Sequence, residues 1–229
     1  SLISLIFGWP KIQVPAVIAV IGILHLVESV LILVDGHRDA LPVIMKHKRF
    51  TPVGAFVMSK LWPVPLVMLA IPTQLIPASG SSIPMPDWWP AFGFQNQSGL
   101  ILFPLSVIIE YSGLAVTGAP RQRTRITGLW LGAYSLIILT LAVLSVKIYW
   151  LQYLAAILMP LLHEGILYAS QKSQLDGKPI FGAPWRGLRI LDVLPESMGS
   201  RVGLKPGDIL LNVNGQPVNS EEMISDALN

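Results

Sequence analysis

The sequence predicts an all-α polytopic membrane bundle of about five transmembrane helices, followed by a small, partial α+β domain. Of its 229 residues, 52% are hydrophobic and only 13% are charged, whereas an average soluble domain carries roughly 25% charged residues. Long apolar stretches recur up to residue 169, and the pattern then changes to short apolar runs separated by Gly, Pro and Asn. We therefore expect a transmembrane domain (1–169), a linker (170–186) and a C-terminal domain (187–229).

Five stretches are long enough to cross a bilayer as helices, namely residues 14–34, 53–76, 100–117, 126–146 and 149–169. The second stretch contains Pro63, Pro65 and Pro72. Because proline removes a backbone donor and clashes with the preceding turn, we expect this helix to be kinked or broken. In the fourth stretch Gly128 and Gly132 form a Gly-x-x-x-Gly pattern, which lets two helix backbones approach closely. We expect this pattern to serve packing within the chain.

Most Lys and Arg residues lie in three segments, which are residues 35–51, residues 118–125 and the chain after residue 169, and the turn between the fourth and fifth stretches has only Lys147. The long segment 77–99 has neither Lys nor Arg. If the five spans alternate in direction, all three basic segments lie on one side, and the positive-inside rule makes that side the cytoplasm. The sequence therefore predicts a multi-pass protein of the bacterial cytoplasmic (inner) membrane with a cytoplasmic C-terminal domain.

Several classes of function find no support in the residues. The chain has no cysteine, which excludes disulfides, thiolate zinc sites and a cysteine nucleophile. Neither a phosphate-binding Gly-x-x-x-x-Gly-Lys loop nor a Gly-x-Ser-x-Gly elbow occurs. The net charge of +3 is explained by basic loops that face anionic lipid, so the bilayer is an expected partner and nucleic acid is not.

Ionisable residues interrupt four of the predicted spans. Lys60 lies in the second, and the others are His25, Glu28, Glu110, His163 and Glu164. A charge at the bilayer centre costs about 2.5–3.5 kcal/mol, so these groups are expected to share one layer and to satisfy one another. Three roles are open: a site for zinc or another divalent metal, a proton or ion path, and an ion-pair network that fixes helix packing. We favour the packing network, which needs no cofactor and no catalysis.

The C-terminal region has the turn residues and short apolar runs of a small domain built from strands. Two apolar strands, at 188–194 and 208–213, flank the sequence Gly203-Leu-Lys-Pro-Gly-Asp208. Asn214 and Gly215 predict a type I′ turn, because both central residues of that turn need a positive φ. Ser220 is placed to cap a helix that has acidic residues in its first turn. Because this helix breaks off at Asn229, we expect a piece of a longer domain.

These motifs resemble the PDZ domains of the HtrA, tail-specific protease and site-2 protease families. The matching residues are Val193-Leu-Pro-Glu-Ser197, Gly203-Leu-Lys-Pro-Gly-Asp208 and Asn214-Gly215. PDZ domains bind an extended peptide by adding it as a strand to a sheet edge. The resemblance implies a peptide-binding edge at Phe181, Gly182, Leu188 and Ile190, with a compressed binding loop.

The same resemblance raises one alternative, an intramembrane metal-dependent protease or regulator. His163-Glu164 matches the start of the His-Glu-x-x-His helix of site-2 proteases, but residue 167 is Leu, so the second histidine ligand is missing. The arrangement of several spans before a cytoplasmic PDZ domain is similar to MinJ-like division-site adaptors of Gram-positive bacteria. That similarity implies a membrane scaffold that recruits protein partners in cell-division positioning, and it is compatible with a homo-oligomer.

Overall fold

The computed structural model describes residues 14–48, 52–70, 88 and 101–228. Three long helices are present in this part of the chain: α2 (Val14–Val34), α3 (Pro120–Ser145) and α4 (Leu151–Asp176). Each is long and apolar enough to cross a membrane, with mean hydropathies of 2.7, 2.0 and 1.3 over an 18-residue stretch of α2, α3 and α4, respectively. A helix that is apolar on all sides is typical of a lipid environment. These helices confirm the first, fourth and fifth predicted helical segments.

The second and third predicted spans are strands, so the prediction of helices there is wrong. β2 (Val53–Ala70) and β3 (Ile101–Ala115) occupy most of those two segments. Residues 71–76 and 100 of the predicted spans lie outside the described residues. In a helix Pro63 and Pro65 would each remove a donor and clash with the preceding turn. In β3 the run Val107-Ile108-Ile109 is β-branched and favours extended backbone. The structure therefore has three candidate helical spans among the described residues instead of five.

The prolines of β2 are placed where a strand tolerates them. β1 (Leu41–Met45) pairs antiparallel with the start of β2, with Pro42 opposite Phe56 and Leu41 opposite Val57. Opposed residues alternate between hydrogen-bonded and non-bonded pairs, and Pro42 fits the non-bonded kind. The N–H groups of odd-numbered residues of β2 therefore point toward the edge that pairs with β1. β1 reaches only as far as Val57, so Pro63 and Pro65 lie beyond it on the same edge, and their missing donors break no hydrogen bond to β1.

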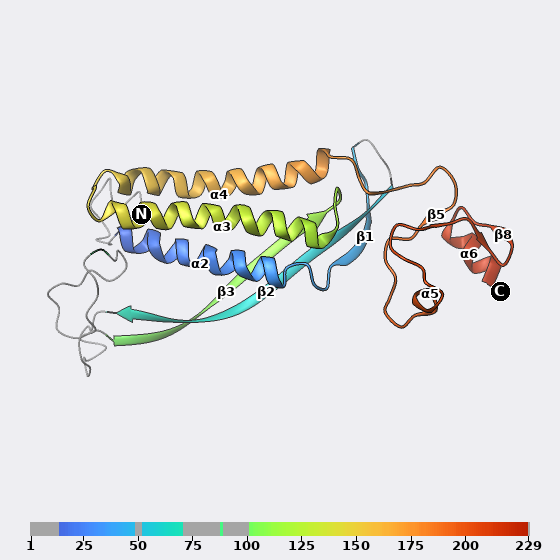
Figure 1. Cartoon of the computed structure of the whole chain (residues 1–229), viewed down its shortest axis with the longest axis horizontal. Helices are drawn as coiled ribbons and strands as arrows, with labels where there is room; N and C mark the ends of the chain where they lie inside the picture. Colours follow the sequence, from blue (N-terminus) through green and yellow to red (C-terminus); the bar gives the residue numbers. More distant parts are fainter. Residues whose placement is uncertain (1–13, 49–51, 71–87, 89–100, 229) are drawn as a thin grey trace. The chain divides into compact units, whose positions relative to one another are not determined.

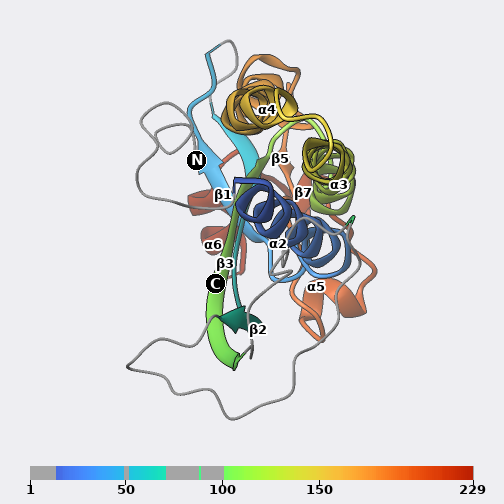
Figure 2. The same cartoon turned by 90° about the vertical axis from the view of Figure 1, so that its left-hand side faces the viewer.

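One compact unit comprises the described residues 14–36, 60–70, 88, 101–111 and 125–168. In this unit α2, α3 and α4 lie side by side, and the two long strands run alongside them (Figures 1 and 2). Gly128 and Gly132 of α3 lie against α2, since an added Cβ would come within 2.7 Å of Leu33 Cγ and 2.8 Å of Ser29 Oγ, respectively. The Gly-x-x-x-Gly pattern therefore packs helices within the chain, as predicted.

A second unit comprises residues 37–59, 112–124 and 169–229. Its apolar core contains Val53, Ala55 and Val116. β4 (Phe181–Gly182) pairs antiparallel with β2, with Gly182 opposite Val53 and Phe181 opposite Gly54. Because β1 pairs with the same two residues of β2, β4 occupies the opposite edge of that strand.

Gln174 joins the end of α4 to the end of β3 in this unit. Its Oε1 accepts hydrogen bonds from the Val116 N–H (2.9 Å), the Thr117 N–H (3.1 Å) and the Thr117 hydroxyl (3.1 Å). The side chain is buried. One amide oxygen thus satisfies the backbone donors where β3 stops, and nothing in the local sequence marked Gln174 for this role.

Replacing Gln174 with leucine should lower the free energy of unfolding by about 1–3 kcal/mol, because it leaves the Val116 N–H buried without its acceptor. Thermal unfolding followed by circular dichroism in detergent measures the effect. The control is Gln171→Leu, an exposed position on the same helix, which should change stability little. Equal stability of the two variants would show that the hydrogen bonds to the Gln174 side chain do not stabilise the end of β3.

The C-terminal region contains short elements, and their bounds are β5 (Leu188–Arg189), α5 (Met198–Arg201), β6 (Ile209–Leu210), β7 (Asn212–Val213), β8 (Gln216–Pro217) and α6 (Glu221–Leu228). Asn214 and Gly215 have φ values of 51° and 80°, and Val213 pairs with Gln216, which confirms the predicted turn. The Ser220 hydroxyl accepts a hydrogen bond from the Met223 N–H (3.4 Å), which confirms the predicted helix cap. The predicted strands are shorter than expected.

Candidate functional sites

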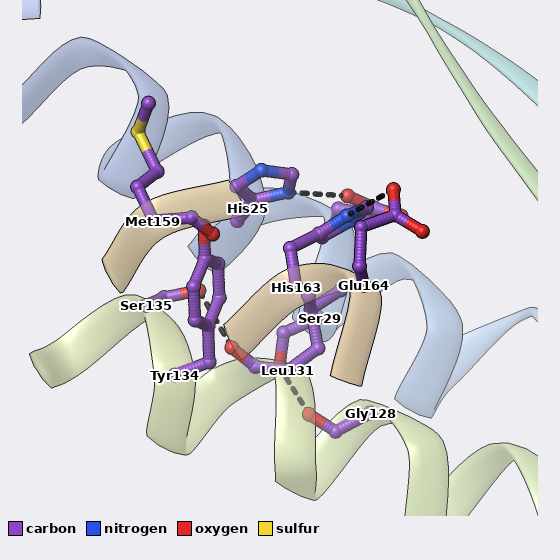
Figure 3. A network of polar contacts seen from close by, with 10 residues as sticks. His25, Ser29, Gly128, Leu131, Tyr134, Ser135, Met159, His163 and Glu164 are labelled. Carbon is purple, nitrogen blue, oxygen red and sulfur yellow. Dashed lines mark hydrogen bonds and ion pairs between the residues drawn. The ribbon is translucent and has the colours of Figure 1, made fainter. Parts of the chain in front are cut away.

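A polar network lies among α2, α3 and α4 (Figure 3). His25 Nδ1 is 2.9 Å from the Glu28 carboxylate, one turn further along the same face of α2. The His25 ring lies 4.9 Å from the His163 ring of α4 and 5.4 Å from the Tyr134 ring of α3, measured between centroids. His163 Nδ1 is 3.9 Å from Glu164. The structure thus brings His25, Glu28 and His163 together and adds Tyr134.

Glu110 does not join this network. It is exposed on β3, where Ile109 and Tyr111 are buried and Ile108 is 70% exposed. The sequence argument placed Glu110 by the helical rise of about 1.5 Å per residue, but successive residues of a strand point to opposite faces. Glu164 is also turned outward, since its side chain is 77% exposed against 18% for Glu28. Within the described ranges, no group of three or more His, Asp or Glu side chains is placed to hold a metal.

Uncharged side chains link the same three helices. The Tyr134 hydroxyl donates to the Met159 carbonyl (3.0 Å) and so connects α3 to α4. The Ser29 hydroxyl donates to the Gly128 carbonyl (2.8 Å) and connects α2 to α3, as Figure 3 shows. The sequence reasoning missed Tyr134 and Ser29 because it searched the spans for charges alone. A usable signal was the small Ser29, which fits the close helix approach that Gly128 predicts.

The end of α2 is fastened to the strand hairpin by a second polar group. Asp35 accepts a hydrogen bond from Trp62 Nε1 (2.9 Å) and lies 3.6 Å from Lys60 Nζ. The Trp62 ring stacks on Tyr111 of β3 at a centroid distance of 6.5 Å. Lys60 is therefore neutralised by Asp35, at the end of α2.

Of the residues expected at a peptide-binding edge, three lie in hydrogen-bonded strands and Ile190 directly follows one. Phe181 and Gly182 form β4 on the edge of β2. Leu188 belongs to β5, which pairs with β6. Ile190 donates its N–H to the Asp208 carbonyl, and its own carbonyl accepts from the Gly207 N–H, each at 2.8 Å.

Arg189 ties β4 to this C-terminal sheet. Its Nε donates to the Gly182 carbonyl (3.0 Å), and its Nη1 donates to the Gly207 carbonyl (3.2 Å). The two acceptors lie on segments that are 25 residues apart in the chain, as their numbers 182 and 207 show. A single guanidinium thus holds β4 in a fixed place relative to β5 and β6.

These features define a class of protein: candidate membrane helices followed by a C-terminal PDZ module. Residues 189–229 match the family model for the PDZ domain. The chain is also 26% identical over 219 residues to the cell division topological determinant MinJ of Bacillus subtilis (strain 168). That alignment covers 93% of this chain and 52% of MinJ, so the chain spans about half the length of this relative. No solved structure matches the chain significantly.

Proposed function

We propose that the protein is a membrane-anchored adaptor of bacterial cell division that recruits protein partners through its C-terminal PDZ domain. The observation that carries this proposal is the extent of the similarity to MinJ, which covers 93% of the chain and so includes the candidate spans together with the PDZ segment. Strand addition to a PDZ edge supplies the recruitment chemistry. This recruitment is binding alone and needs no catalytic group, so we assign the protein the role of a scaffold.

The PDZ domain of this adaptor faces the cytoplasm. Support comes from the exposed Arg121 and Arg125 at the start of α3 and the exposed Lys172 near the end of α4. The finding of strands in place of two helices leaves this argument intact. β2 and β3 run in opposite directions (Figure 1), so the hairpin returns the chain to the side from which it left.

The network of His25, Glu28 and His163 has a packing role in this proposal. Support comes from the 2.9 Å contact between His25 and Glu28 and from the outward position of Glu110 and Glu164 among the described residues. The part-buried pair is satisfied within α2, and the contacts of the His25 ring with His163 and Tyr134 join the three helices.

Localisation of a fluorescent fusion to the natural full-length protein tests the proposal. We expect enrichment at division sites, and we expect a variant without residues 187–229 to stay in the membrane and to cause misplaced septa. A uniform membrane distribution, or normal septum placement in the deletion strain, would sink the adaptor role. A cysteine in place of Glu196 tests the orientation, because an impermeant maleimide should label it only after the cells are opened.

A further inference from the structure

The strand pairing between β4 and β2 joins the C-terminal domain to a segment about 130 residues earlier in the chain, since Gly182 pairs with Val53. Side chains reinforce the pairing on one face. A Cβ added to Gly54 would lie 2.7 Å from Leu191 Cδ1 and 3.0 Å from Phe181 Cβ. The Phe56 ring meets the Phe181 ring edge to face at 5.6 Å.

The two faces of β2 serve different purposes at this point. Val53 and Ala55 point into the apolar core of the unit. Gly54 and Phe56 alternate with them and point to the other face, where they contact Leu191 and Phe181 of the C-terminal domain. The segment Gly54-Ala55-Phe56 therefore offers the C-terminal domain a glycine with space for Leu191 and an aromatic ring for Phe181.

We infer that β2 occupies the peptide-binding edge of the PDZ domain in cis, and that this edge takes extended segments of the pattern Gly-x-Phe. The inference rests on the proposed function, because it treats Phe181–Gly182 as the edge to which partner peptides add. The ligand's glycine fits against Leu191, and its aromatic ring packs on Phe181. A partner strand binds by displacing Val53–Gly54 of the same chain.

The geometry favours displacement because the internal strand is held weakly at this edge. Only two residue pairs join β4 to β2, because β4 itself is two residues long. The internal strand benefits from an effective concentration on the order of millimolar. A partner segment that carries both the glycine and the aromatic ring can compete once its concentration exceeds that value, while a peptide without them cannot.

A reversible disulfide tests whether the edge is occupied. Opposed residues of antiparallel strands have Cα atoms about 4.5–5.5 Å apart, which lies within the range that a disulfide spans. The double variant Val53→Cys/Gly182→Cys, made in the full chain in lipid nanodiscs, should cross-link in most molecules under mild oxidation. The control, Val53→Cys/Trp185→Cys, places the second cysteine at a fully exposed position and should cross-link about tenfold less. Mass spectrometry of the linked peptides gives the yield.

A labelled peptide with the sequence of residues 52–58, Pro-Val-Gly-Ala-Phe-Val-Met, then probes the edge. The reduced double-cysteine chain should bind it at least about tenfold more tightly than the oxidised chain, because the disulfide prevents release of β2. Gly54→Val in the chain should raise probe affinity by about the same factor over the exposed control Ser59→Val, since the valine clashes with Leu191 and Phe181.

Absence of the cross-link would overturn the inference, and so would equal probe binding, or none, by the oxidised and reduced chains. The oxidised and reduced forms are the same variant and differ only in a reversible disulfide. Misfolding of the variant therefore cannot produce a difference between them. Normal division-site localisation without the cross-link would refute this inference and leave the adaptor role standing. The cross-link and probe results without localisation at division sites would refute the adaptor role alone.

Discussion

Replacing Gly128 with alanine should lower the free energy of unfolding of the helical unit by about 1–3 kcal/mol, the usual cost of an added methyl group in a tight interface. The added Cβ would lie 2.7 Å from Leu33 Cγ and 3.2 Å from the Ser29 backbone carbonyl. A backbone carbonyl cannot move aside as a side chain can. The displacement should also break the hydrogen bond from Ser29 to the Gly128 carbonyl. Thermal unfolding in detergent, followed by circular dichroism, measures the loss.

The matched control is Gly165→Ala on α4, where an added Cβ meets no atom within 4 Å. Alanine is the better helix former by roughly 0.5–1 kcal/mol, so this variant should be as stable as the wild type or more stable. The two glycine substitutions therefore have opposite expected signs. A loss of stability that is the same at both positions would show that α3 does not depend on its contact with α2.

Replacing His25 with leucine should destabilise the helical unit by about 1–3 kcal/mol, the cost of leaving a partly buried carboxylate without its hydrogen-bond partner. Glu28 would then keep a half-buried carboxylate between the helices without the 2.9 Å contact that His25 provides. Chemical denaturation in mixed micelles measures the change. The double variant His25→Leu/Glu28→Leu should recover most of the loss, because two well-packed apolar side chains replace the pair at little cost.

One control and two possible outcomes test the coupling between His25 and Glu28. Glu164→Leu should change stability little, since the Glu164 side chain is 77% exposed. Costs of His25→Leu and Glu28→Leu that simply add in the double variant would show that the two residues are not coupled. Stoichiometric zinc or iron in the purified protein, lost on His163→Ala, would replace the packing role with a metal site.

Much of the architecture follows from local patterns along the chain. The helices α2, α3 and α4 follow from apolar runs that need no partner to be recognised, since the bilayer supplies the apolar surroundings. Asn214 and Gly215 predict their own turn, and Ser220 predicts its own cap, because these structures depend on backbone angles and bonds within a few residues. The close contact of Gly128 with α2 was also predictable from residue size alone.

The extended segments were mispredicted because hydropathy measures whether a segment avoids water and not how its backbone is bonded. Residues 53–70 and 101–115 are apolar enough for lipid, yet they are strands. The prolines at 63 and 65 and the β-branched run at 107–109 carried the signal. The grouping of Glu110 with the histidines failed for the same reason, since it assumed a helical rise.

The sequence by itself determined three helices apolar enough to cross a membrane and a C-terminal PDZ segment, because composition, turn residues and caps act locally. Only the tertiary structure decided which polar groups of different elements meet, namely His25 with His163, and Gln174 with the end of β3. It also decided that Phe181 and Gly182 pair with β2. Contacts of this kind join residues separated by tens to more than a hundred positions, and their free energy depends on burial and register that no local pattern contains.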